Sequence, residues 1–248
     1  MSCRLRVIRP VEITAGEDGL LRQQEIAQEL TSADSTPKLL IWRCRRTLFV
    51  SRSETRLPRF DEAVAQMRVC GWPVVARRSG GAACPAGPGT LQLSLIEVAP
   101  PTVEMNAKYA ALATYIQRTL SRWLDIDVQI GAVVGAYCPG RYDLTVKEKK
   151  IAGMSQHWFR NESGIRCVVT AASINLGEPP DELARIVSQF YAYADSPLRC
   201  QAEALTNIRL CAAMSKLPGP DLPSIATAQF AATTQLLQGA IVAHGAGI

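Results

Sequence analysis

The chain has 248 residues, of which 48% are hydrophobic and 20% charged, and its formal net charge is +5 at pH 7. This length and balance are typical of a globular protein with one large or two small domains. No run approaches the ~18 apolar residues of a membrane span, and the charged N-terminus is unlike a signal peptide, so we expect a cytoplasmic protein without a membrane partner. The modest charge, with no basic block interleaved with aromatic residues, also argues against nucleic acid.

The first half of the chain predicts a helix, two strands, a second helix and two further strands. An amphipathic pattern predicts a helix at residues 16–30. Residues 38–51 predict two strands or a tight hairpin. Residues 57–71, with proline near the start and glycine after the end, predict a helix. Residues 72–89 predict a short strand that runs into a loop rich in glycine and proline, and the alternating leucines of 90–98 predict a half-buried strand.

The second half continues the mixture of helices and strands. Residues 106–124 form the strongest helical pattern, and residues 127–137 predict a strand. Residues 141–159 predict two antiparallel strands around a charged turn at 147–149. A further strand is expected at 164–176 and a helix at 180–194, where acidic residues in the first turn complement the helix dipole.

The irregular order of these elements predicts the fold class. We expect an α+β fold, in which helices flank a mixed but largely antiparallel sheet. A linker or loop is expected at 216–224 and a last helix at 224–238. We find no internal repeat, so residues 1–248 are interpreted as a single domain, with 216–248 as its C-terminal loop and helix.

Cysteines and histidines limit the chemistry that the chain can carry. Eight cysteines are scattered without a Cys-x-x-Cys pair, and the only histidines are His157 and His244. In a reducing compartment this pattern argues against both a disulfide framework and a zinc site, so we expect no metal. His157 is interpreted as a core or edge histidine. Asp143 is expected to close a local hydrogen bond in its strand, with a role in orienting substrate as the alternative.

The segment Arg-Arg-Ser-Gly-Gly at residues 77–81 is the first candidate for a functional site. Paired glycines let a backbone approach a ligand closely, and their amides can face an acyl carbonyl, a carboxylate or a phosphate. The segment is not a Walker loop, because no Gly-Lys-Ser/Thr follows it, and it lacks the spacing of a dinucleotide-binding loop. An ordinary surface turn is the competing interpretation.

Cys138 and Lys150 are the next candidates. Cys138 ends a predicted strand directly before Pro-Gly, where a thiol can reach a loop mouth. A nearby cation would favour its nucleophilic thiolate form, and with so few histidines that cation would be Lys150, Arg141 or Arg78. Lys150 opens a strand that continues with small residues to Gly153, and its ammonium suits a carbonyl or a phosphate. The competing interpretations are a buried structural cysteine and a solvated lysine.

Taken together, these segments resemble the lipoate/octanoate transferase and lipoate–protein ligase family, which shares its catalytic fold with biotin protein ligases. Residues 77–81 resemble the family's Arg-Arg-x-Ser-Gly-Gly-Gly loop. Residues 140–156, GRYDLTVKEKKIAGMSQ, resemble its second motif, which contains Asp-Leu-x-Val and Lys-Ile-x-Gly. The two motifs come in the family's order, and the resemblance covers about residues 15–195.

The resemblance implies an enzyme that forms an amide between an octanoyl or lipoyl group and a lysine of a lipoyl domain. Such domains belong to the E2 subunits of 2-oxoacid dehydrogenases and to the glycine cleavage H protein. Lys150 would hold the acyl carbonyl or acyl-phosphate oxygen. The residues implied in substrate binding are Arg78, Ser79, Gly80, Gly81, Tyr142, Asp143 and Gly153.

The stretch YCPGRYDL resembles the branch of octanoyl transferases and lipoyl amidotransferases, which carry the acyl group on a cysteine just before the second motif. Cys138 matches that position, which implies transfer from an acyl carrier protein or an acylated H protein through a Cys138 thioester, without a cofactor. The loop lacks the family's third glycine, which weakens the case for a nucleotide more than for an acyl group. The alternatives are an ATP-dependent and Mg²⁺-dependent lipoate ligase and a non-catalytic relative that binds acyl groups or lipoyl domains.

Overall fold

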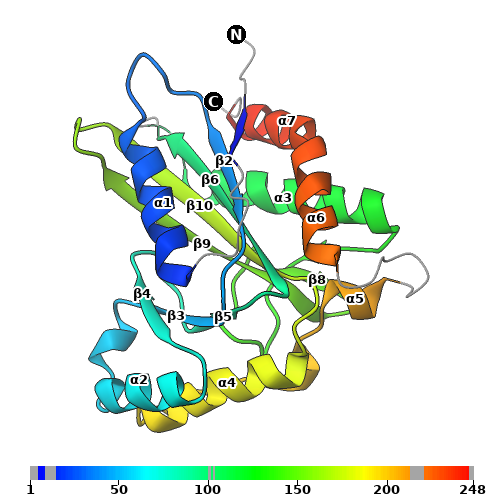
Figure 1. Ribbon diagram of the computed structural model, residues 1–248. Helices are drawn as coiled ribbons and strands as arrows, with labels where there is room; N and C mark the ends of the chain where they lie inside the picture. Colours follow the sequence, from blue (N-terminus) through cyan, green and yellow to red (C-terminus); the bar gives the residue numbers. More distant parts are fainter. Residues whose placement is uncertain (1–4, 9–14, 100–101, 103, 213–220, 246–248) are drawn as a thin grey trace.

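The computed structural model describes residues 5–8, 15–99, 102, 104–212 and 221–245 (Figure 1). Seven strands form the main sheet in the order β1-β2-β6-β10-β9-β8-β7, and β4-β3-β5 form a smaller sheet beneath it. All neighbours in the main sheet are antiparallel except β1 and β2, which confirms the predicted α+β class. The strands are β1 (Arg6–Ile8), β2 (Lys38–Trp42), β3 (Thr47–Ser51), β4 (Val74–Arg77), β5 (Cys84–Ala86), β6 (Thr90–Val98), β7 (Gln129–Ile130), β8 (Leu144–Val146), β9 (Lys149–Arg160) and β10 (Arg166–Asn175).

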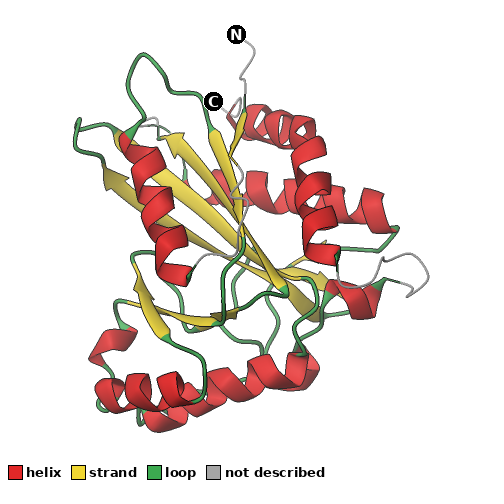
Figure 2. Cartoon of the chain, viewed as in Figure 1, coloured by secondary structure: helices red, strands yellow, loops and turns green. Residues whose placement is uncertain are grey.

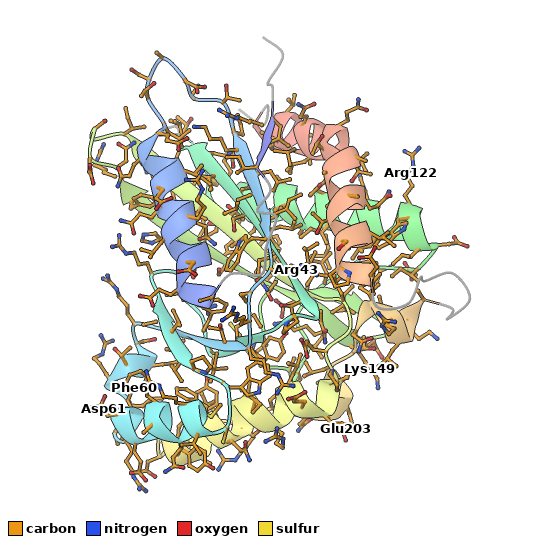
Figure 3. All side chains as sticks on the ribbon, viewed as in Figure 1. Arg43, Phe60, Asp61, Arg122, Lys149 and Glu203 are labelled. Carbon is orange, nitrogen blue, oxygen red and sulfur yellow. The ribbon has the colours of Figure 1, made fainter. Side chains whose placement is uncertain are left out.

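Helices cover both faces of the main sheet (Figure 2). One face packs on α1, and the other packs on α3, α6 and α7, while α2 and α4 pack together beside the smaller sheet. Side chains fill the space between these helices and the strands (Figure 3). The helices are α1 (Gly16–Gln28), α2 (Phe60–Val69), α3 (Met105–Leu124), α4 (Pro180–Tyr193), α5 (Ile208–Cys211), α6 (Leu222–Ala232) and α7 (Thr234–Gly245), with 3₁₀ turns η1 (Glu54–Arg56) and η2 (Ala202–Ala204). Among the described helices, none has the length and apolar composition needed to cross a membrane.

The elements with the clearest periodicity lie where the sequence predicts them. The helices predicted at 16–30, 57–71, 106–124 and 180–194 correspond to α1, α2, α3 and α4. The predicted pair of strands around 147–149 corresponds to β8 and β9. Lys147 and Glu148 both adopt positive φ values, 50° and 60°, which is the backbone of a two-residue type I′ hairpin turn.

Of the two alternatives for residues 38–51, two strands is confirmed and a hairpin is wrong, because β2 and β3 belong to different sheets. Two other strand predictions need correction. The loop expected after the first strand of 72–89 contains a second short strand, β5, which pairs with β3. Within 127–137 only β7 is a strand, because the glycine-rich remainder leaves the sheet in turns.

Two further predictions differ from the structure. Strand β6 is not half-buried, since all of its residues except Val98 are buried, and Gln92 and Ser94 face away from the leucines. The tail contains two helices, α6 and α7, in place of one, because the chain turns at Thr233. Most of the loop expected at 216–224 lies outside the described residues.

Candidate active site

A cavity of about 460 Å³ lies between α1, β4 and the face of the main sheet that packs on α1. This volume is within the usual range for a small-molecule pocket. Its walls are largely apolar. The polar side chains of β6, for which the alternating sequence predicted a solvated face, line this cavity. The apolar side chains include Leu20, Trp42, Phe49, Phe159 and Val169. Cys138, Lys150 and Gly153 lie on the same wall, so the structure brings both predicted catalytic residues to one pocket.

Hydrogen-bond donors surround the sulfur of Cys138. The amide of Ala82 donates to Cys138 Sγ at 3.1 Å, and Nη2 of Arg77 lies 4.0 Å from the same sulfur. Cys138 is half-buried, and its φ of 41° is unusual for a residue with a side chain. The sulfur is thus partly exposed to the cavity, with an amide donor and a guanidinium beside it.

Gly81 is required by this arrangement. Its φ of +104° is readily adopted only by glycine, and a Cβ atom at this position would lie 2.8 Å from Cys138 Sγ and 2.9 Å from Nη2 of Arg77. Its neighbour Gly80 has no such constraint, since a Cβ there would meet no atom within 4 Å. Of the two predicted glycines, only Gly81 lets the loop approach the sulfur.

Lys150 is held inside the protein by three acceptors. Its Nζ donates to the carbonyls of Tyr137 and Cys138, both at 2.9 Å, and forms an ion pair with Asp143 Oδ2 at 2.8 Å. The side chains of Lys150 and Asp143 are each 1% exposed. An ammonium has three N–H donors, so Lys150 would have to release one acceptor before it could hold a substrate carbonyl. Its bond to the Cys138 carbonyl supports the unusual backbone of the cysteine.

Asp143 completes this buried pair. Burial raises the pKa of Asp143, and the Lys150 ammonium and amide hydrogen bonds from Gly140 and Met154 oppose that rise. Gly153 leaves the space that the pair occupies, since a Cβ there would lie 3.0 Å from Nζ of Lys150. Asp143 does accept a local hydrogen bond, from the Gly140 amide at 2.8 Å, but in the turn before β8 and not within the strand as predicted.

The remaining predicted binding residues lie further from the sulfur. Arg78 is exposed and Ser79 half-buried where they line the large cavity. Tyr142 lines a second cavity of about 220 Å³, beside Asp143 and Met154. Its ring stacks on Tyr109 of α3, with centroids 5.2 Å apart.

The sequence interpretation missed Arg77. The adjacent Arg78 was considered, but it is Nη2 of Arg77 that lies 4.0 Å from the sulfur. Arg77 is 8% exposed and donates to the Ala82 carbonyl at 2.8 Å. Both arginines line the large cavity, but Arg77 is buried at the end of β4, whereas Arg78 follows the strand and is exposed.

His157 lies on the wall of the large cavity and stacks on Phe159, with ring centroids 4.8 Å apart. Its Nε2 is buried and has no hydrogen-bond partner among the described residues. Burial lowers the pKa of His157, and the positive charges of Arg78 and Arg52 lower it further. The ring is thus held neutral in a largely apolar pocket, which refines its interpretation as a core or edge histidine.

Several other cysteines are in environments that suppress reactivity. Burial raises the pKa of Cys44 to about 12 and that of Cys200 to about 11. It also raises the pKa of Cys84, which lines the large cavity. Among the described residues, no group of three or more His, Cys, Asp or Glu side chains is arranged to hold a metal ion.

The fold and the paired motifs define a class of protein with a cysteine and a buried lysine beside an apolar pocket on a largely antiparallel sheet. The family model of the lipoyl protein ligase A/B catalytic domain matches residues 17–209. The chain belongs to this family, which confirms the family resemblance of the sequence.

Individual relatives support the same assignment. The chain is 33% identical over 147 residues to the Octanoyl-[GcvH]:protein N-octanoyltransferase of Anoxybacillus flavithermus, covering 58% of this chain and 52% of that protein. It spans about half the length of the first curated relatives that it matches.

Solved structures share the fold at low sequence identity. A bi-partite lipoate protein ligase from Thermoplasma acidophilum matches with a TM-score of 0.65 and 16% identity, over 97% of this chain and 91% of that chain. A lipoate-protein ligase A bound with ATP matches with a TM-score of 0.64 and 17% identity, over 97% and 93% of the two chains. These likenesses confirm the predicted lipoate ligase fold.

Proposed function

We propose that this protein is an acyltransferase that moves an octanoyl or lipoyl group to a lysine of a lipoyl domain through a thioester on Cys138. The observation that carries this proposal is the sulfur of Cys138, on the wall of an apolar cavity and beside the Ala82 amide and the Arg77 guanidinium. The similarity to the octanoyltransferase from Anoxybacillus flavithermus supports it. The chain is treated as one catalytic domain, and cytoplasmic enzymes that depend on lipoyl domains are its expected context.

In the first step, the Cys138 thiolate attacks the acyl carbonyl of a donor. With an octanoylated H protein as donor, the bond to the lysine nitrogen breaks, that nitrogen takes up a proton and leaves as an amine, and a thioester forms. The Ala82 amide and Arg77 are placed to stabilise negative charge near the sulfur and the carbonyl oxygen. Lys150 joins them by exchanging the Cys138 carbonyl for the substrate oxygen.

In the second step, the amine of a lysine on an acceptor lipoyl domain attacks the thioester. A new amide forms, the amine loses a proton, and the Cys138 thiolate leaves. The E2 subunits of 2-oxoacid dehydrogenases are the proposed acceptors, and an acyl carrier protein is the alternative donor. Lipoyl domains tend to be acidic, so the net charge of +5 would favour the encounter.

The loop does not fit a nucleotide in the arrangement that the ATP-dependent alternative requires. The Ala83 amide donates to the buried carboxylate of Glu54 at 2.8 Å. A phosphate at this point would meet an occupied donor and a like charge. This contact favours acyl transfer over activation of free lipoate by ATP and Mg²⁺.

Intact mass spectrometry tests the proposal. The protein is mixed with octanoylated H protein, and separately with octanoyl acyl carrier protein, and we expect a gain of one hydroxylamine-labile octanoyl group. The adduct should be absent from Cys138→Ser and retained in Cys70→Ser, which removes an exposed thiol on another part of the surface. An adduct that persists in Cys138→Ser refutes the thioester. Absence of any adduct, together with lipoate-dependent release of pyrophosphate from ATP, establishes the ligase.

A further inference from the structure

A buried carboxylate, Glu54, binds two separate segments behind the candidate active site. Its side chain belongs to the 3₁₀ turn η1, and the residue is 7% exposed. Glu54 Oε2 accepts from the amide of Ser51 at 2.7 Å and from its hydroxyl at 3.1 Å. Glu54 Oε1 accepts from the amide of Ala83 at 2.8 Å. One carboxylate thus ties the end of β3 to the end of the glycine-containing loop.

Tyr191 of α4 is the third partner of this carboxylate. Its hydroxyl donates to Glu54 Oε1 and accepts from the Ala83 amide at 3.0 Å. Burial and the Glu54 carboxylate raise the pKa of Tyr191, so the phenol stays protonated and remains a donor. The amide of Ala83 therefore lies between two oxygens that are themselves hydrogen-bonded.

Both segments held by Glu54 lead directly to the sulfur of Cys138. Ser51 lies opposite Arg77 in the register of β3 and β4, and Arg77 is one of the two groups near the sulfur. Ala83 follows Ala82, whose amide is the other group. Arg77 also donates to the Ala82 carbonyl, so the two groups are joined to each other as well.

This loop needs an external support. Gly80 and Gly81 give it a flexible backbone, and no side chain packs at Gly80 to restrain it. A buried carboxylate is costly unless its oxygens are hydrogen-bonded, and the Glu54 oxygens have four donors. An apolar side chain could fill the same volume without that cost but could not hold an amide. A carboxylate at position 54 can therefore fix a backbone N–H of the loop, which an apolar side chain cannot do.

We propose that Glu54 and Tyr191 are positioning residues, which hold Ala82 and Arg77 in the orientation that keeps Cys138 reactive. Their importance for acyl transfer rests on the proposed function, because it is the thioester chemistry that requires a reactive sulfur. Their effect on the sulfur itself is independent of any acyl donor.

Two opposite effects make the inference testable by sign. Acting through space alone, the negative charge of Glu54 disfavours a thiolate, so its removal would make Cys138 more reactive. If Glu54 acts by positioning, its removal disorders the donors at the sulfur and makes Cys138 less reactive. The direction of the change separates a bystander charge from a positioning residue.

The experiment measures alkylation of Cys138 by iodoacetamide from pH 6 to pH 10, with the modified site identified by peptide mass spectrometry. For Glu54→Gln we expect the midpoint of the rate–pH curve to move upward by about one unit, with a roughly tenfold slower rate near neutral pH. A glutamine keeps one acceptor oxygen, so it cannot bind both Ser51 and Ala83 as the carboxylate does. Tyr191→Phe should move the midpoint in the same direction by a smaller amount.

Matched controls lie on the other face of the main sheet. Glu97→Gln changes a buried glutamate paired with Lys108, and Tyr115→Phe removes a buried hydroxyl that donates to the Phe230 carbonyl. Both should lower the melting temperature without moving the alkylation curve of Cys138.

An unchanged or downward-shifted midpoint in Glu54→Gln, or in Tyr191→Phe if the glutamine variant does not fold, overturns the positioning role. If the midpoint rises but the wild-type protein never forms an acyl adduct, the proposed function fails and the positioning role stands. If the adduct forms and the midpoint does not rise, the proposed function stands and the positioning role of Glu54 fails.

Discussion

The two faces of the main sheet differ in what their side chains do. On the face that packs on α3, α6 and α7, Leu91, Leu93 and Leu95 of β6 join an apolar core. On the face that packs on α1, Gln92 and Ser94 of the same strand line the large cavity. A single alternating strand thus supplies stability on one side and a pocket on the other. The comparison shows that buried polar residues in a strand can mark a site.

A buried pair of a lysine and an acid, Lys150 and Asp143, lies beside the large cavity, and another, Lys108 and Glu97, lies on the opposite face. These two pairs give the largest expected effects. Lys150→Met removes the partner of Asp143 and two hydrogen bonds to the backbone around Cys138. We expect a loss of about 3–5 kcal/mol in the free energy of unfolding, since one charge is left buried without its partner. Urea unfolding measures that loss, and the acyl-enzyme assay should show that transfer is abolished.

Lys108→Met is the counterpart on the other face, where Lys108 pairs with Glu97 at 2.8 Å. It should destabilise the protein by an amount at the lower end of the same range, because Lys108 is 11% exposed and Lys150 only 1%. The folded fraction should still form the acyl-enzyme at the wild-type rate. Loss of acylation in Lys108→Met would contradict the division between the two faces.

Substitutions of two neighbouring residues in β6, Leu93 and Ser94, test the difference between the two faces of the main sheet. Leu93→Ala leaves a void in the apolar core and should cost about 2–5 kcal/mol. Ser94→Ala removes the acceptor of Trp42 Nε1 at 3.1 Å and of Gln23 Nε2 at 3.0 Å, at a cost of about 1–3 kcal/mol. Only Ser94→Ala should raise the KM for an octanoyl donor, because Gln23 ties α1 to the cavity wall. Equal effects on KM would remove the distinction.

Local patterns in the sequence predicted much of the fold and part of the site. The helical period of 106–124 predicted α3, and the charged residues at 147–149 predicted the hairpin of β8 and β9. The second motif contains Lys150, and Cys138 lies just before it. Because these two residues are close in the sequence, they could be placed in one proposed site. These features depend on neighbours in sequence or on a shared element.

No local pattern in the sequence indicates which distant segments come into contact. Arg77 lies 61 residues from Cys138, and Glu54 lies 137 residues from Tyr191. Which buried glutamate meets which tyrosine depends on how the smaller sheet packs on α4, and no local period records that packing. For the same reason, the sequence could not show that Tyr142 stacks on Tyr109 beside a second cavity.

Adjacent glycines in the loop provide a smaller and more local test of the cavity face. Gly81→Ala places a methyl group against Cys138 Sγ and forces a positive φ on alanine, which costs about 1–2 kcal/mol in backbone energy alone. We expect acyl-enzyme formation to slow by about 10- to 100-fold, measured by rapid-quench mass spectrometry. Gly80→Ala meets no atom within 4 Å and should react at nearly the wild-type rate. Similar rates for both variants would show that close approach of the loop is not required.

The smallest expected effect concerns His157, the titratable ring on the cavity wall. Because its pKa is lowered in the folded protein, the unfolded chain binds more protons below its ordinary value of about 6.5. Its contribution to stability is therefore complete above that pH and is lost as the pH falls toward the folded value. His157→Phe keeps an aromatic ring against Phe159 and removes the titration. Urea unfolding at pH 7.5 and pH 5.5 should show a smaller acid loss in the variant, by less than about 1 kcal/mol because the residue is only half-buried. An identical acid loss in both proteins would mean that protonation of this ring is not resisted by the fold, and the cavity would then accept a cation that its apolar walls should exclude.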